Sequence, residues 1–175
     1  QYDLLVQLTC AAEGSLIVFS AENADDFCDT GETELENLYI YAAGSDPIDL
    51  SCIETVTGYL EIESSTAPSI DLSGLLSVTE EIYIHEKEER ASVDMSGLET
   101  ASSYITISSN DDLASIYLSS LETIDDQLYI SSNGELATLD LDSLESVGSS
   151  IQFYSSNSLD EISMPSLTDV EGSIY

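Results

Sequence analysis

Pairs of apolar residues, with one polar residue between the two members, recur along the chain at a nearly constant interval. Successive units begin 22 or 23 residues apart, Ile174 opens a seventh, and the six complete units open at Leu38, Leu60, Ile82, Ile105, Leu128 and Ile151. A second pair follows in every unit, as at Ile70 and Leu72, and two further apolar columns follow that pair. Six copies that align at four columns identify an internal repeat.

Each pair alternates apolar and polar residues, which places its apolar members on one face of a short β-strand. A helix needs apolar spacings of three and four over roughly ten residues or more, and the segments between the pairs leave no room for one. A unit of this size cannot bury its own leucine and isoleucine side chains, so they are covered when successive coils stack. The sequence therefore predicts an all-β fold, a parallel β-solenoid of about seven coils of 22–23 residues. We place an N-terminal cap with a first imperfect coil at 1–34 and the repeats at 35–175, within one structural domain.

Asparagines follow the first strand at nearly the same place in three consecutive units. They are Asn110, Asn133 and Asn157. Asparagine tolerates the left-handed backbone and can bond the amides of a turn, so we expect these residues to form corners of the coil.

The composition is strongly acidic, with 35 Asp or Glu against 2 Lys or Arg and a net charge of −33. Nucleic acid and anionic membrane surfaces are predicted to be poor partners, because every phosphate contact needs a cation. No apolar run reaches the roughly 18 residues of a membrane-spanning helix, so we expect this segment to make no membrane contact. The apolar residues are periodic, so the charge lies on a folded surface and does not mark a disordered tail.

Stacked coils turn each polar column into a ladder on the outside of the solenoid. One ladder brings Asp49, Asp71 and Asp94 to about 5 Å from one another, where neighbouring carboxylates repel by roughly 1 kcal/mol per pair. Calcium ions could relieve this repulsion, but no dense acidic calcium loop is present. We favour a solvated acidic face screened by mobile ions.

A second set of columns carries aromatic side chains on the face of the first strands. The tyrosines concerned are Tyr39, Tyr41, Tyr83, Tyr129 and Tyr154, interleaved with hydroxyl and amide residues. Such a face can stack on sugar rings, which predicts contact with a glycan. The alternative is that tyrosine is used for its high β-propensity and packs against its neighbours in adjacent coils.

The sequence contains little that supports catalysis. Its one histidine, His85, lies on a regular strand, and a Ser or Cys nucleophile needs an oriented base. A polysaccharide hydrolase needs a cleft that separates the pKa values of two carboxylates, and a regular repeat predicts no such cleft. The cysteines and His85 belong to distant coils, so we expect no metal site. We therefore predict no catalytic residue, no metal and no cofactor.

The unit Leu-x-Ile-x-x-Asn-x-x-Leu-x-x-Ile-x-Leu-x-x-Leu-x-x-Ile, clearest over 105–124 and 128–147, resembles the leucine-rich-like repeat of receptor L domains. The Ser-rich form of the unit and the stretch from Cys10 to Cys28 are more similar to fungal cell-wall and sporulation-specific proteins of that superfamily. The resemblance covers about residues 10–175. It implies a right-handed solenoid in a secreted, GPI-anchored protein of the extracellular wall.

The same resemblance implies that a cysteine pair fastens the N-terminal cap. We expect a disulfide between Cys10 and Cys28, with two buried thiols as the alternative. A bond that closes a loop of about 18 residues stabilises by roughly 3 kcal/mol in the chain-entropy account. Cys52 takes the place that Gly74 and Gly97 hold in later coils, so it is either a small half-buried residue or a thiol available to a second chain.

The last residues, Ile174 and Tyr175, begin a seventh copy of the unit. An open solenoid end exposes apolar side chains and unpaired strand amides. Either the chain is a fragment of a longer protein, or subunits stack head to tail and form a filament.

These observations favour a non-enzymatic extracellular surface or cell-wall scaffold or adhesion protein, secreted and O-glycosylated on Ser and Thr. Cell-wall polysaccharide or other surface proteins are the expected partners. The alternative is a self-assembling structural fibre protein that polymerises by head-to-tail stacking of solenoid ends.

Overall fold

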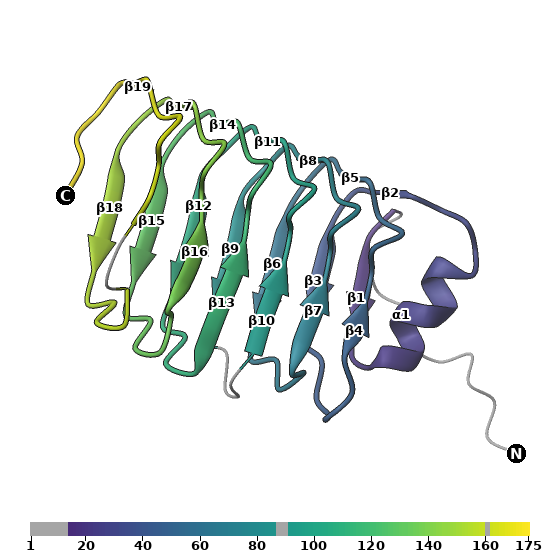
Figure 1. Cartoon of the computed structure of the whole chain (residues 1–175). Coiled ribbons are helices and arrows are strands. Elements are labelled where there is room, and N and C mark those ends of the chain that lie inside the picture. Colours follow the sequence, from purple (N-terminus) through teal and green to yellow (C-terminus); the bar gives the residue numbers. More distant parts are fainter. Residues whose placement is uncertain (1–13, 87–90, 160–161) are drawn as a thin grey trace, which may run out of the picture.

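The computed structural model describes residues 14–86, 91–159 and 162–175. The chain winds into a β-solenoid of about six turns, with one short helix at its N-terminal end (Figure 1). Among the described residues all strand pairs are parallel, and each strand inside a sheet pairs with the equivalent strands of the coils before and after it. The predicted fold class is confirmed.

Three parallel sheets form the three sides of the solenoid. Sheet A has seven strands: β1 (Leu16–Val18), β3 (Leu38–Ile40), β6 (Leu60–Glu63), β9 (Ile82–His85), β12 (Ile105–Ser108), β15 (Leu128–Ser131) and β18 (Ile151–Tyr154). Sheet B has five: β4 (Ile48–Asp49), β7 (Ser69–Asp71), β10 (Ala91–Asp94), β13 (Leu113–Tyr117) and β16 (Thr138–Asp140). Sheet C has seven short strands: β2 (Glu34–Leu35), β5 (Thr55–Val56), β8 (Ser77–Val78), β11 (Thr100–Ala101), β14 (Thr123–Ile124), β17 (Ser146–Val147) and β19 (Asp169–Val170).

The register of sheet A follows the repeat. Leu60 pairs with Ile82, Ile82 with Ile105, and Ile105 with Leu128, so the first apolar column is a single file inside the solenoid. These four side chains are fully buried, as are most members of the other apolar columns. Each side chain is therefore covered by its counterparts in the adjoining coils, which is the packing that the period predicts.

Asparagine does shape the corners after sheet A, although it does not adopt the left-handed backbone. That backbone belongs to the preceding corner position, where φ is positive in five successive coils, at Ser64, Glu86, Ser109, Ser132 and Ser155. Asn110 and Asn133 directly follow two of these residues. Asn110 and Asn133 are fully buried and bridge coils: Asn110 Nδ2 donates to Ile84 O and to Asn133 Oδ1, both at 2.9 Å, and Asn133 Nδ2 donates to Ile107 O at 2.9 Å. Asn157 is exposed, because Ser156 takes its place in the column.

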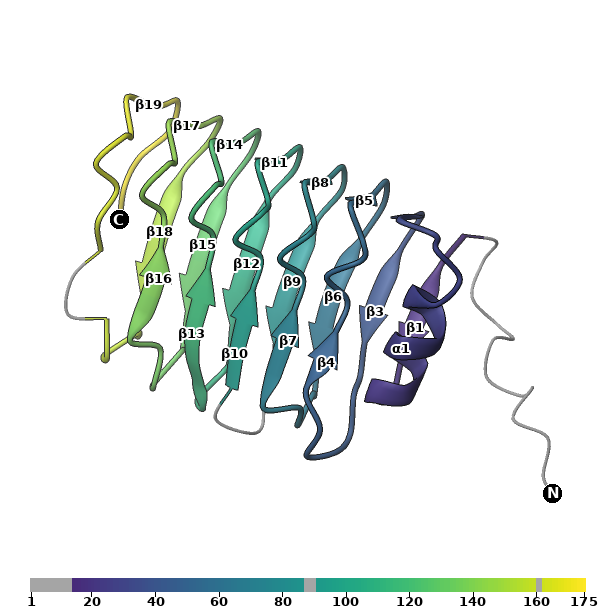
Figure 2. The same cartoon turned by 45° about the vertical axis from the view of Figure 1, so that its right-hand side comes forward.

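The sequence pattern missed the helix α1 (Ala21–Cys28). The Ser20 hydroxyl caps it by accepting the Asn23 N–H at 3.3 Å. The helix packs beside β1 and β4 and buries Ala24 against the core (Figures 1 and 2). The helix thus covers β4, the edge strand of sheet B. Its eight residues do not follow the repeat, so the apolar period could not predict it.

The predicted Cys10–Cys28 disulfide is wrong, because Cys28 is bonded to Cys52 with a Cα–Cα distance of 5.7 Å. Cys10 lies outside the described residues. Gly74 occupies the position of Cys52 in the next coil, and there the backbone lies close to the coil before it. A Cβ on Gly74 would lie 2.0 Å from Ser51 O. At Cys52 the preceding element is the end of α1, which carries the partner cysteine. The bond therefore fastens the helix to the first full coil.

Candidate functional site

The outer surface of sheet A carries the predicted tyrosines in two register columns. The first column runs Tyr39, Glu61, Tyr83, Thr106, Tyr129 and Gln152. The second runs Glu63, His85, Ser108, Ser131 and Tyr154. We call this surface the tyrosine face. Tyrosine therefore occupies every second coil of the first column, with a polar side chain between one tyrosine and the next.

An open groove of about 540 Å³ lies on the tyrosine face. We call it the tyrosine groove, and it is lined by Tyr39, Tyr59, Glu61, Tyr83, His85, Thr106 and Ser108. The structure thus brings Tyr39 and Tyr83 into one site and adds Tyr59, which is 43% exposed. A carboxylate, an imidazole and two hydroxyl groups stand among the aromatic rings, so the groove offers both stacking surfaces and hydrogen-bonding groups.

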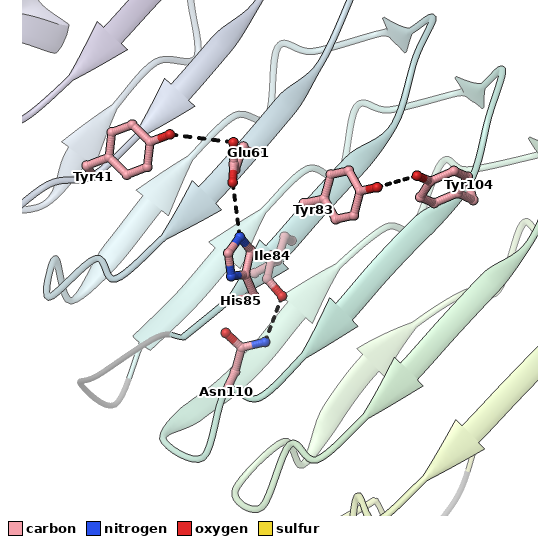
Figure 3. A network of polar contacts seen from close by, with 7 residues as sticks. All are labelled: Tyr41, Glu61, Tyr83, Ile84, His85, Tyr104 and Asn110. Carbon is pink, nitrogen blue, oxygen red and sulfur yellow. Dashed lines mark hydrogen bonds and ion pairs between the residues drawn. The ribbon is translucent and has the colours of Figure 1, made fainter.

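Tyr59 and Tyr104 are two aromatic residues of this surface that the sequence did not lead us to predict. Each directly precedes the first apolar residue of its unit, so a tyrosine before Leu60 or Ile105 was the available signal. The Tyr104 ring packs edge-to-face on Tyr83 with ring centroids 5.5 Å apart, and the two hydroxyl groups are hydrogen-bonded (Figure 3). The bond to Tyr83 and burial raise the pKa of Tyr104 far above its ordinary value. The ring contact and the hydrogen bond together fix the orientation of the two rings.

Glu61 stands at the centre of a second polar network (Figure 3). His85 Nε2 lies 3.1 Å from Glu61 Oε1, and the Tyr41 hydroxyl donates to Glu61 Oε2 at 3.5 Å. Burial, with the nearby charges of Glu61 and Glu63, raises the pKa of Tyr41 to about 12. Glu61 and His85 are each 26% exposed, so the network is reachable from solvent.

Two of the predicted glycan-contact tyrosines lie away from the groove. Tyr129 and Tyr154 pack on each other with centroids 6.0 Å apart, further along the same face. Tyr41 stacks nearly parallel on Tyr39, with centroids 6.3 Å apart, and supports the groove from its side. The five predicted residues therefore share one face but not one pocket.

The aspartate ladder has a structural explanation. Asp49, Asp71 and Asp94 are in register on sheet B, as predicted. Each carboxylate accepts the backbone N–H of the residue two positions later, at 2.9–3.0 Å. The Ser51 hydroxyl and N–H lower the pKa of Asp49. Turn formation thus accounts for these residues without a bound ion.

Within residues 14–86, 91–159 and 162–175, one group of side chains has the chemistry of a metal site. The potential ligand atoms of Glu61, Glu63 and His85 all lie within 4.8 Å of one another. The expectation of no metal site rested on the distance of His85 from the cysteines and did not include these neighbours. The signal was Glu-x-Glu in one unit and a histidine one period after the second glutamate.

At the far end of the solenoid, Ile174 bridges to Ile151 and extends sheet A by part of a coil. Ile174 and Tyr175 are 56% and 63% exposed. Stacking of ends through these residues stays a prediction. Among the described residues no helix is long and apolar enough to cross a membrane.

Comparison with protein-family models, with curated proteins and with solved structures finds no match for the chain. The resemblance to receptor L domains and fungal wall proteins therefore stays a prediction.

Proposed function

We propose that this protein is a non-enzymatic surface scaffold or adhesion module that binds an extended, uncharged polysaccharide along the tyrosine face. The strands of neighbouring coils are about 4.8 Å apart, so tyrosines on every second coil recur at about 9.6 Å. That separation is on the scale of a disaccharide, the repeating unit of many linear β-linked glycans. The period of Tyr39, Tyr83 and Tyr129 is the observation that carries the proposal.

The groups around the rings suit the same ligand. The apolar face of a sugar stacks on an aromatic ring, while its hydroxyl groups bond to carboxylates and hydroxyl side chains such as Glu61, Thr106 and Ser108. The net charge of −33 repels anionic glycans, which favours a neutral or cationic polymer. The Cys28–Cys52 disulfide fits an oxidising, extracellular location such as a cell wall.

Affinity electrophoresis and calorimetry with soluble β-glucan and with chitin oligosaccharides test the proposal. Tyr39→Ala and Tyr129→Ala should each weaken binding on the order of tenfold, since an aromatic contact contributes about 0.5–1.5 kcal/mol. The double variant should lose nearly all binding. Affinity should also rise in steps of two sugar units as the oligosaccharide is lengthened, because every second coil supplies a ring.

Tyr117→Ala is the matched control, since Tyr117 is 37% exposed but lies on sheet B. It should bind as the unmodified protein does. Equal losses in Tyr117→Ala and Tyr39→Ala, or no retention by any neutral or cationic polysaccharide, would overturn the proposal.

The alternative function, a fibre assembled by head-to-tail stacking, has less support. Exposed Ile174 and Tyr175 favour an interaction at one end. At the other end, α1 lies against the edge strand β4 of sheet B, so that edge is covered. Sedimentation separates the two functions, because polymers that grow with protein concentration support the fibre and a monomer that binds polysaccharide supports the adhesion module.

A further inference from the structure

Three metal-ligating side chains converge on the outer surface of sheet A from two adjacent strands. Glu61 and Glu63 are alternate residues of β6, so both point away from the core. His85, on β9, is the register partner of Glu63. The strand register therefore holds two carboxylates and the one imidazole of the chain side by side, and their ligand atoms lie within 4.8 Å of one another.

The separation of His85 Nε2 from Glu61 Oε1 is close to the ligand spacing of a zinc coordination sphere. Ligands about 2.0–2.1 Å from a tetrahedral zinc ion are roughly 3.4 Å apart. His85 Nε2 and Glu61 Oε1 are 3.1 Å apart, so an ion between them needs only a small side-chain adjustment. A metal ion at Nε2 would require the imidazole tautomer that carries its proton on Nδ1.

A neighbouring side chain orients one of these ligands. The Tyr41 hydroxyl donates to Glu61 Oε2, which leaves Oε1 directed at His85 (Figure 3). A hydrogen bond to the outer oxygen of a ligating carboxylate is the usual support of a protein metal site. Tyr41 is therefore a positioning residue for Glu61.

We propose that Glu61, Glu63 and His85 bind one divalent transition-metal ion of the zinc class. An imidazole with carboxylates suits zinc, copper or nickel, whereas calcium and magnesium prefer oxygen ligands alone. Three protein ligands leave a fourth position for water or for a ligand group in the tyrosine groove, which Glu61 and His85 also line. The inference is independent of polysaccharide binding, because it concerns the ion alone.

The test is calorimetric titration of the chelator-treated protein with ZnCl₂ in excess MgCl₂, which occupies the acidic surface. One Zn²⁺ should bind per chain. His85→Asn and Glu63→Gln should each lower the affinity on the order of 100-fold or more, and Tyr41→Phe by about tenfold, the effect typical of an outer-sphere partner. NMR gives a direct readout, because the single imidazole supplies one set of ring signals that Zn²⁺ should shift.

Glu122→Gln is the matched control, since it removes the same charge from an exposed glutamate between β13 and β14. It should leave zinc affinity unchanged. The proposal is overturned if no saturable binding occurs, if His85→Asn binds as the unmodified protein does, or if Glu122→Gln loses as much affinity as Glu63→Gln. Urea unfolding of each variant shows whether a loss comes from misfolding, which half-exposed side chains should not cause.

Discussion

Replacement of both bonded cysteines, as Cys28→Ser with Cys52→Ser, should destabilise the protein by about 3.5 kcal/mol. The figure follows from a sequence separation of 24 residues and the entropy that a loop of this length removes from the unfolded chain. It is a large share of the roughly 5–15 kcal/mol that separates folded from unfolded states in most domains. The double variant is needed because Cys52→Ser alone frees Cys28 to bond elsewhere.

Urea unfolding followed by circular dichroism measures the effect at fixed ionic strength. The dependence of the unfolding free energy on urea should also steepen, because the unfolded chain without the crosslink exposes more surface. Chemical reduction of the unmodified protein should lower the unfolding free energy by a similar amount. It serves as a check because it breaks the disulfide without replacing any residue.

Cys10→Ser is the decisive control. A Cys10–Cys28 bond would close a loop of about 18 residues and stabilise by about 3.2 kcal/mol, so the size of the loss cannot separate the two pairings. The two pairings are distinguished by which cysteine substitutions destabilise the protein. Cys10→Ser should change stability by less than about 0.5 kcal/mol. A loss of about 3 kcal/mol in Cys10→Ser, or a Cys10–Cys28 peptide in a non-reducing digest, would refute the reasoning.

Three further predictions concern the corners, the tyrosine face and the charge. Asn133→Ala should lower the unfolding free energy by about 2–4 kcal/mol, because it removes the Nδ2 donor to buried Ile107 O and the Oδ1 acceptor that Asn110 uses. Exposed Asn157→Ala should cost less than about 0.5 kcal/mol in the same urea assay. Ultraviolet titration should show one tyrosine that ionises at about pH 12 and is absent from Tyr41→Phe. Folding raises the pKa of Tyr41 from 10.0, so the stability that neutral Tyr41 contributes is complete below pH 10 and is lost as the pH rises toward 12. Ionisation of Tyr41 near pH 10 would contradict this prediction. Raising NaCl from about 0.01 to about 1 M should increase stability, because the screening length falls from about 30 to about 3 Å and the carboxylates of a chain with net charge −33 repel less; unchanged or reduced stability in salt would count against a self-repelling surface.

The sequence alone was sufficient for the repeated part of the fold. Its columns predicted which residues are buried and which share a face, because a parallel stack places each residue beside its counterpart one period away. Leu60, Ile82 and Ile105 pair as the period requires. Tyr39, Tyr83 and Tyr129 also share the predicted column.

Only the tertiary structure decided the features that break the repeat or cross between columns. Helix α1 does not follow the repeat; its N-terminus is capped by Ser20 and it packs against β4. The pairing of Cys28 with Cys52 follows from that packing and could not be predicted from the spacing of the cysteines. The meeting of Glu61 with His85 depends on how side chains lean between neighbouring coils. A period specifies the backbone register of each rung, whereas contacts between different columns depend on side-chain rotamers, which the period does not specify.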